Sequence, residues 1–92
     1  MEMMKVSSKS HPSKVAWALT CLLRECGCVQ IQVIGAGALN QAMKAIAISR
    51  GYVAASGKEI YCVPCFYDLS IQDETVTSLR LNVEMREKDF SF

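Results

Sequence analysis

The segment from residue 29 to residue 50 constrains the fold of this chain more than any other part of the sequence. Apolar and polar side chains alternate over residues 29–34, which is the period of a strand with one buried face. Gly35-Ala36-Gly37 then forms a tight turn into a helix expected over residues 38–50. One stripe of this helix is Leu39, Met43, Ile46 and Arg50. Most of the remaining circumference is apolar as well, through Ala42, Ala45, Ala47 and Ile48. A helix that is apolar on several sides must be buried on several sides.

A strand and a helix are expected before this segment. Residues 3–8 form a short alternating run, which predicts the first strand. The serines and the proline at residues 10–13 are helix-start signals, because proline fits the first turn and serine can cap free N–H groups. We expect this helix to run to Cys26, with Gly27 as its left-handed stop. Its predicted inner stripe is Val15, Leu19, Leu22 and Cys26.

Two more strands are expected after the second helix, for which Gly51 is the predicted stop. Residues 59–67 form the third strand, and Pro64 within it indicates an edge position or a bulge. Residues 68–74 are expected to be a polar turn, and residues 75–86 form the fourth strand. The fourth strand should point Leu79, Leu81, Val83 and Met85 inward, and Arg80, Asn82, Glu84 and Arg86 outward.

The expected order of elements is βαβαββ, with neither an internal repeat nor a linker. This order predicts an α/β (α+β) two-layer sandwich over residues 1–86, with two helices on a four-stranded mixed sheet. Residues 87–92 have no period and are expected to be a loose tail. The chain has 92 residues, of which 51% are hydrophobic. We therefore expect one domain that buries some apolar surface in a homodimer or higher homo-oligomer, through Trp17, Ala45 and Ile48.

The charges of the chain are nearly balanced, with a formal net charge of +1. Any nucleic-acid site must therefore be a local patch and not a global positive field. Residues 1–5 lack the long apolar region of a secretory signal, and no apolar run approaches the length of a membrane span. Five cysteines are an odd number, which favours reduced thiols. We expect a cytoplasmic protein without membrane contact.

Sites for metal or catalysis are not indicated by the sequence. Cys26 and Cys28, like Cys62 and Cys65, have spacings that suggest zinc ligands. Cys62 and Cys65 would point to opposite faces of a strand, however, and could converge only if the strand kinks. His11 has no acid or nucleophile near it in the sequence. We therefore expect no enzyme activity, no catalytic residue and no metal site.

The glycine turn at residues 35–37 has the setting of a dinucleotide-binding fingerprint, between a strand and a helix. Asn40 occupies the position of the third glycine, and the chain is too short for a doubly wound sheet, so no cofactor is expected. Two interpretations of Gly35 and Gly37 stay open. They form a plain tight turn, or they let the N–H groups of a helix start approach a phosphate.

Several stretches together resemble the stage V sporulation protein S family. They are Val6-Ser7-Ser8-Lys9-Ser10, Val15-Ala16, residues 34–42, residues 44–48, Arg50-Gly51 and residues 64–66. The resemblance covers most of the chain and is most specific over residues 34–51. It implies an Alba-like fold, which is associated with nucleic-acid binding and with dimers, and it implies a role in sporulation or developmental regulation.

The resemblance also maps a candidate nucleic-acid site onto the loop before the first helix and onto the second helix start. The residues are Lys9, Ser10, Lys14, Gly35, Gly37, Asn40, Gln41 and Lys44. Acidic residues in the expected turn at 68–74, among them Asp73, depart from the basic hairpin of Alba proteins. Two functions therefore stay open: a regulatory protein that contacts RNA or DNA phosphates with little sequence preference, and a protein-interaction module that uses the same fold without nucleic acid.

Overall fold

The computed structural model describes residues 2–71 and 74–88. The order of its elements is βαβαββ, as predicted. They are β1 (Glu2–Val6), α1 (Pro12–Cys26), β2 (Cys28–Val33), α2 (Ala36–Ala54), β3 (Lys58–Ile71) and β4 (Glu74–Glu87). None of the helices described is long and apolar enough to cross a membrane.

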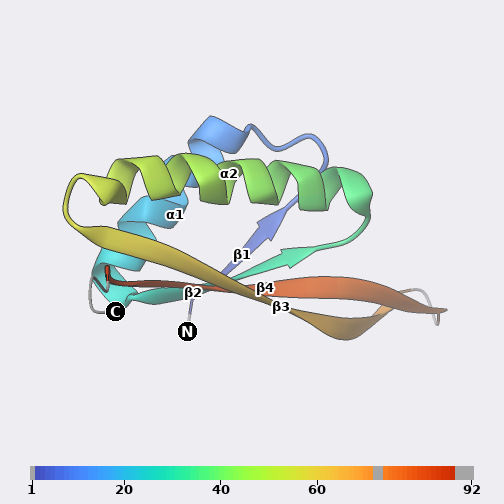
Figure 1. Cartoon of the computed structure of the whole chain (residues 1–92). Helices are drawn as coiled ribbons and strands as arrows, with labels where there is room; N and C mark the ends of the chain where they lie inside the picture. The colour runs from blue at the N-terminus through green and yellow to red at the C-terminus, as the bar shows by residue number, and fades with distance from the viewer. Residues whose placement is uncertain (1, 72–73, 89–92) are drawn as a thin grey trace.

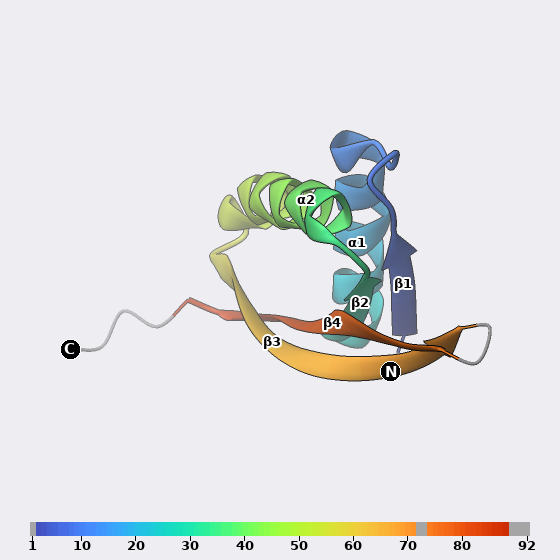
Figure 2. The same ribbon diagram turned by 90° about the vertical axis from the view of Figure 1, so that its right-hand side faces the viewer.

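The strands form one mixed sheet in the order β1-β2-β4-β3. β1 and β2 are parallel, and β4 pairs antiparallel with both β2 and β3. Both helices lie on one side of this sheet, and the long β3–β4 hairpin extends beyond them (Figures 1 and 2). The predicted two-layer sandwich is therefore confirmed. Pro64 lies in β3, which is an edge strand as expected, and edge strands tolerate proline because one side of the strand has no partner.

The core lies between the sheet and the helices. Because side chains alternate along a strand, every second residue of the central strands points into this core. Val29 and Ile31 of β2 and Leu81 and Val83 of β4 are buried almost completely. The neighbouring residues of the same strands point to the other side, as the alternation predicted. The two faces of the sheet therefore have different compositions, although the same strands build both.

The buried stripe of α1 differs from the predicted one. The buried residues are Ala16, Leu19, Thr20 and Leu23, whereas Val15 and Leu22 are half-buried and Cys26 is exposed. The cause is contact with α2, because Thr20 Oγ1 lies 2.7 Å from Ser49 Oγ between the two helices. Thr20 also donates to the carbonyl oxygen of Ala16 at 2.7 Å, so the buried hydroxyl is satisfied.

The predicted stripe of α2 is also wrong in part. Its buried residues are Ala38, Ala42, Ala45, Ile46, Ser49 and Val53, whereas Met43 and Arg50 are exposed. Of these, Ser49 contacts Thr20 of α1, whereas Ala38, Ala42 and Ile46 belong to the core cluster. Gly51 does not end this helix, which continues to Ala54 because Val53 in its last turn is completely buried. Gly51 itself is exposed and lies within the helix.

The polar turn predicted over residues 68–74 is much shorter in the structure. Backbone pairing continues from Asp68 opposite Thr77 to Ile71 opposite Glu74. Asp73 lies outside the described residues. At the other end, Glu87 still belongs to β4 and the N–H of Lys88 donates to the carbonyl oxygen of Gly57, and the rest of the tail predicted over residues 87–92 lies outside the described residues.

Candidate nucleic-acid interface

The loop between β1 and α1 is a compact turn held by its own serines. The N–H of Ser7 donates to Ser10 Oγ at 2.9 Å, and the N–H of Ser10 donates to the carbonyl oxygen of Ser7 at 3.1 Å. The N–H of Lys9 donates to Ser7 Oγ at 3.2 Å. Ser10 was expected to provide a helix-start signal, but its side chain stabilises the turn before the helix. The N-cap of α1 is His11, which makes no side-chain capping bond, and Pro12 is the first helical residue as predicted.

The glycine turn leads directly into α2. Gly35 has a φ of 87°, a backbone conformation that favours glycine, and it is the N-cap of the helix. No side chain caps α2, and neither helix has an acidic residue in its first turn. The first N–H groups of both helices therefore remain available to an anion, which the positive end of each helix dipole attracts.

Two contacts bring this helix start against the serine turn. A Cβ atom at Gly37 would lie only 2.9 Å from the Cβ of Ser8, so the close approach requires glycine at this position. Gln41 Nε2 donates to the carbonyl oxygen of Ser10 at 3.0 Å. Gly37 and Gln41 therefore have structural roles, and they hold the two predicted halves of the site next to each other.

The remaining predicted site residues lie on the surface around this junction. Lys9, Lys14, Asn40 and Lys44 are all exposed. Within residues 2–71 and 74–88, none of the three lysines forms an ion pair. Their ammonium groups are therefore free to contact a ligand rather than a carboxylate of the same chain.

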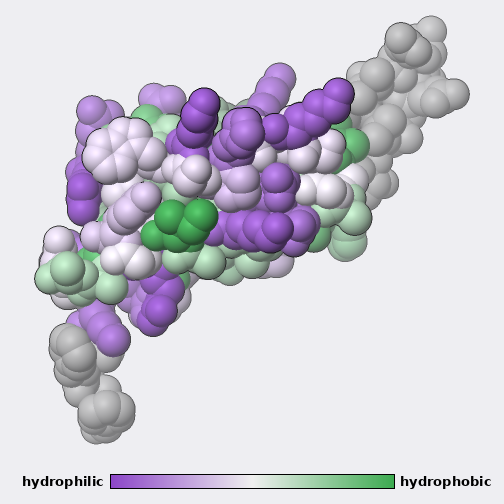
Figure 3. All heavy atoms as spheres, turned by 90° about the horizontal axis from the view of Figure 1, so that it is seen from above, coloured by the Kyte–Doolittle hydropathy of each residue, from purple (hydrophilic) through white to green (hydrophobic). Residues whose placement is uncertain are grey.

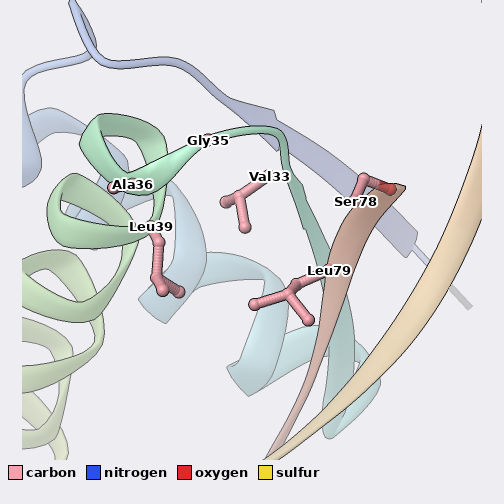
Figure 4. A pocket seen from close by; sticks show the side chains of 6 residues that line it. All are labelled: Val33, Gly35, Ala36, Leu39, Ser78 and Leu79. Carbon is pink, nitrogen blue, oxygen red and sulfur yellow. The ribbon is translucent and has the colours of Figure 1, made fainter. Parts of the chain in front are cut away.

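Two shallow hollows flank the junction. One, of about 200 Å³, lies on the helix side, where Val33, Leu39 and Leu79 point toward one another below Gly35 (Figure 4). Its apolar side chains do not suit a phosphate. The other, of about 270 Å³, is lined by Lys5, Val6, Ser7, Ser8, Gln32 and Ile34. This second hollow connects the serine turn with the side of the sheet that faces away from the helices.

The residues predicted for a subunit interface have three different environments. Trp17 is 62% exposed, and its ring meets that of Tyr52 edge to face at a centroid distance of 6.1 Å. Ile48 is half-buried. Ala45 is completely buried within its own chain and has no surface for a second subunit, so its assignment to the interface is corrected. Seen from above the helices, hydrophobic and hydrophilic residues are mixed over this side (Figure 3).

The cysteines do not come together as zinc ligands. Cys62 pairs with Val83 of the buried face, whereas Cys65 pairs with Arg80 of the opposite face, so the strand keeps them apart. Among the residues described, no three metal-binding side chains cluster. Burial raises the pKa of the Cys62 thiol. Cys26, expected in the inner stripe of α1, is instead exposed, and Cys21 of the same helix is exposed as well.

Two stacked pairs on the sheet were not predicted from the sequence. The guanidinium carbon of Arg80 lies 3.5 Å from the centre of the Tyr67 ring, and that of Arg86 lies 5.2 Å from the centre of the Tyr61 ring. Alternation along β4 placed both arginines outward. In the register Arg80 lies opposite Cys65 and Arg86 lies opposite Glu59, so each arginine reaches the tyrosine that is its diagonal neighbour on β3.

Comparisons with known proteins agree with this architecture. A family model described as Stage V sporulation protein S matches residues 2–86. Among solved structures, the chain is similar to Alba from Thermoplasma volcanium, with a TM-score of 0.63 and 10% sequence identity. That similarity covers 94% of this chain and 100% of the Alba chain. At this identity the similarity concerns the fold alone.

Proposed function

The chain belongs to the stage V sporulation protein S family and has an Alba-like fold, and from this premise we propose that it is a cytoplasmic, nucleic-acid-binding regulatory protein of sporulation. The proposed role is binding and not catalysis. It rests mainly on one observation, the contact of the serine turn with the start of α2 through Ser8 and Gly37. This contact places the start of α2 against the turn that precedes α1; neither helix start is capped by a side chain, and Lys9, Lys14 and Lys44 of these elements are exposed.

The proposed site recognises phosphates and not bases. Helix N–H groups and the lysines Lys9, Lys14 and Lys44 are donors that suit phosphate oxygens. Contacts to phosphates position a nucleic acid but carry no sequence information. We therefore expect RNA or DNA to bind with little sequence preference.

A salt series with the Lys44→Ala variant tests this function. If a dimer uses three lysines per subunit, the logarithm of the duplex affinity should fall against the logarithm of the salt concentration with a slope of about −5. Lys44→Ala should weaken binding equally on all sequences and flatten this slope. Arg24→Ala is the matched control, because it removes one exposed positive charge from the last turn of α1. Unchanged binding by Lys44→Ala would show that the site is placed wrongly.

A second candidate function is a protein-interaction module, and it is favoured by large apolar side chains on the surface. Trp17 is 62% exposed and Phe66 is 81% exposed. We propose that Trp17 and Ile48 contribute to a homodimer. Light scattering should then give more than the 10.2 kDa of one chain, and Trp17→Ser should shift the mass toward the monomer. Absence of any binding to RNA or DNA at low salt would favour this function over the first.

A further inference from the structure

The face of the sheet opposite the helices is covered by no described element of the chain (Figures 1 and 2). We call it the open face. The strand register assigns four sets of residues to it: Met3 and Lys5 of β1; Cys28, Gln30 and Gln32 of β2; Arg80, Asn82, Glu84 and Arg86 of β4; and Tyr61, Val63, Cys65 and Tyr67 of β3. This is a broad surface of amide, guanidinium and phenol groups.

Two flat stacking platforms lie on the open face. One is Arg80 over Tyr67 at 3.5 Å, and the other is Arg86 beside Tyr61 at 5.2 Å. The two arginines are six residues apart on β4, which is roughly 20 Å along a strand. Aromatic rings and guanidinium planes are the groups on which unpaired nucleic-acid bases stack.

Between the platforms, polar atoms lack partners. Two atoms are buried without a partner in the described chain: Arg80 Nε donates no hydrogen bond, and Asn82 Oδ1 accepts none. Asn82 Nδ2 donates only to Cys65 Sγ, at 3.1 Å, which is a weak acceptor. Gln30 lies directly opposite Asn82 in the register. Unsatisfied groups of this kind need an explanation in a folded protein, and a ligand with hydrogen-bonding edges provides one.

The charge of the open face is positive, although the chain as a whole is nearly neutral. Lys5, Arg80 and Arg86 are the cations of this face, and its carboxylates are Glu84 and Glu59, which lies opposite Arg86 in the register. Arg86 donates to Glu84 at 2.8 Å, so this carboxylate is already neutralised. Glu59, at the start of β3, is bound by Arg50 of α2. The remaining positive charge complements a phosphate backbone and not a cationic partner.

The open face is also continuous with the phosphate site. The hollow of about 270 Å³ contains Ser7 and Ser8 of the serine turn together with Lys5 and Gln32 of the open face. Gln32 lies opposite Arg80 in the register, so the hollow leads to the first stacking platform. A chain whose phosphates contact the turn can reach this platform along one side of the sheet.

We propose that the open face binds the bases of a single-stranded nucleic acid whose phosphates are held at the serine turn and the start of α2. This inference rests on the proposed function and narrows its ligand from any nucleic acid to a single strand. Bases in a duplex are stacked on one another and cannot lie flat against a sheet. Unpaired bases can stack on the tyrosine and arginine planes and meet the amides of Gln30 and Asn82.

The experiment compares single strands with duplexes in a fluorescence anisotropy titration of the full chain. The probes are labelled RNA and DNA single strands of about ten nucleotides, and a duplex of the same sequence. Tyr61→Leu removes a stacking ring from the open face, and Tyr52→Leu is the matched control on α2, since both tyrosines are similarly exposed. Tyr61→Leu should weaken single-strand binding by about tenfold and leave duplex binding unchanged. Tyr52→Leu should change neither, and circular dichroism verifies that both variants fold.

The remaining outcomes separate this inference from the proposed function. Arg86→Gln is a second open-face variant that should selectively weaken single-strand binding in the same way. If both open-face variants bind the single strand as well as wild type while Lys44→Ala loses affinity, the open-face inference is overturned and the proposed function stands. If Tyr61→Leu loses affinity and Lys44→Ala does not, the open face binds and the loop site is wrong. Binding of neither probe by wild type, or tighter binding of an acidic peptide than of the single strand, overturns the inference.

Discussion

The two faces of the sheet are built by neighbouring residues of the same strands, yet they have opposite properties. On the covered face, Ile31, Leu81 and Val83 are buried under the helices and their polar backbone groups pair within the sheet. On the open face, the adjacent residues Gln32 and Arg80 present side-chain polar groups instead. Because strand alternation separates these roles residue by residue, one face can specify the fold while the other is free to change with function.

The largest expected effect contrasts Leu81 with its neighbour Asn82. Leu81→Ala removes a buried side chain from the centre of the core and should lower the free energy of unfolding by about 2–5 kcal/mol. Asn82→Ala should change it by less than about 0.5 kcal/mol, because it also removes an unsatisfied buried oxygen. Urea denaturation measures both. Similar losses for the two variants would show that the open face also stabilises the fold.

The next effect concerns the contact between the start of α2 and the serine turn. Gly37→Ala places a Cβ against Ser8 and should destabilise the chain by roughly 1–3 kcal/mol. Gly51→Ala is the matched control in the same helix, where a Cβ meets no atom within 4 Å. It should stabilise the chain by about 0.4–1 kcal/mol. Thermal unfolding measures both shifts, and a neutral Gly37→Ala variant would mean that the turn moves aside without cost.

The Gly37→Ala variant also sharpens the comparison of the faces in a binding assay. Displacing the serine turn should weaken binding of single strands and duplexes alike, since both use the phosphate site. Gly51→Ala should bind both as wild type does. A loss restricted to single strands in Gly37→Ala would assign the turn to the open face and not to a general phosphate site.

The smallest effect comes from an exposed link between the layers. Arg50 of α2 donates to Glu59 of β3 at 2.7 Å and 3.1 Å, and this bond lowers the pKa of Glu59 to about 2 from its usual 4.5. A carboxyl whose pKa is lower in the folded state stabilises the protein above pH 4.5, and the contribution is lost as the pH falls toward 2. The free energy of unfolding of Glu59→Gln, measured at several pH values, should therefore change less steeply between pH 2 and pH 4.5 than that of wild type. Identical curves would show that solvent screening cancels the bond.

Local patterns in the sequence predicted much of the covered face. Alternation in β2 and β4 identified the residues that face the core, and Gly27 was correctly placed as the left-handed stop of α1, with a φ of 81°. The same kind of reasoning failed where two elements meet. The stripe of α1 is displaced toward Ala16 and Thr20 because α2 packs there, and nothing within α1 itself specifies its neighbour.

The candidate site also has features that the sequence predicted and features that only contacts between distant residues show. Lysines beside helix starts can be recognised in the sequence, and the family resemblance placed the two loops together. That Gln41 holds the carbonyl oxygen of Ser10, and that Gly37 is required by Ser8, depends on contacts between residues far apart in the chain. The open face was missed because the stacking of Tyr61 and Tyr67 on arginines of β4 depends on how two strands pair, which no pattern within β3 shows.

The sequence by itself determined the order of the elements and which side of each strand is apolar, because both follow from periods of two and 3.6 residues within short segments. Tertiary structure alone decided the register that stacks Arg80 on Tyr67, the extent of the β3–β4 hairpin beyond the helices and the pairing of Thr20 with Ser49. These features depend on pairing and packing between distant segments. The interactions that stabilise them join residues far apart in the chain, and the pattern within one short segment does not show which residue will be the partner.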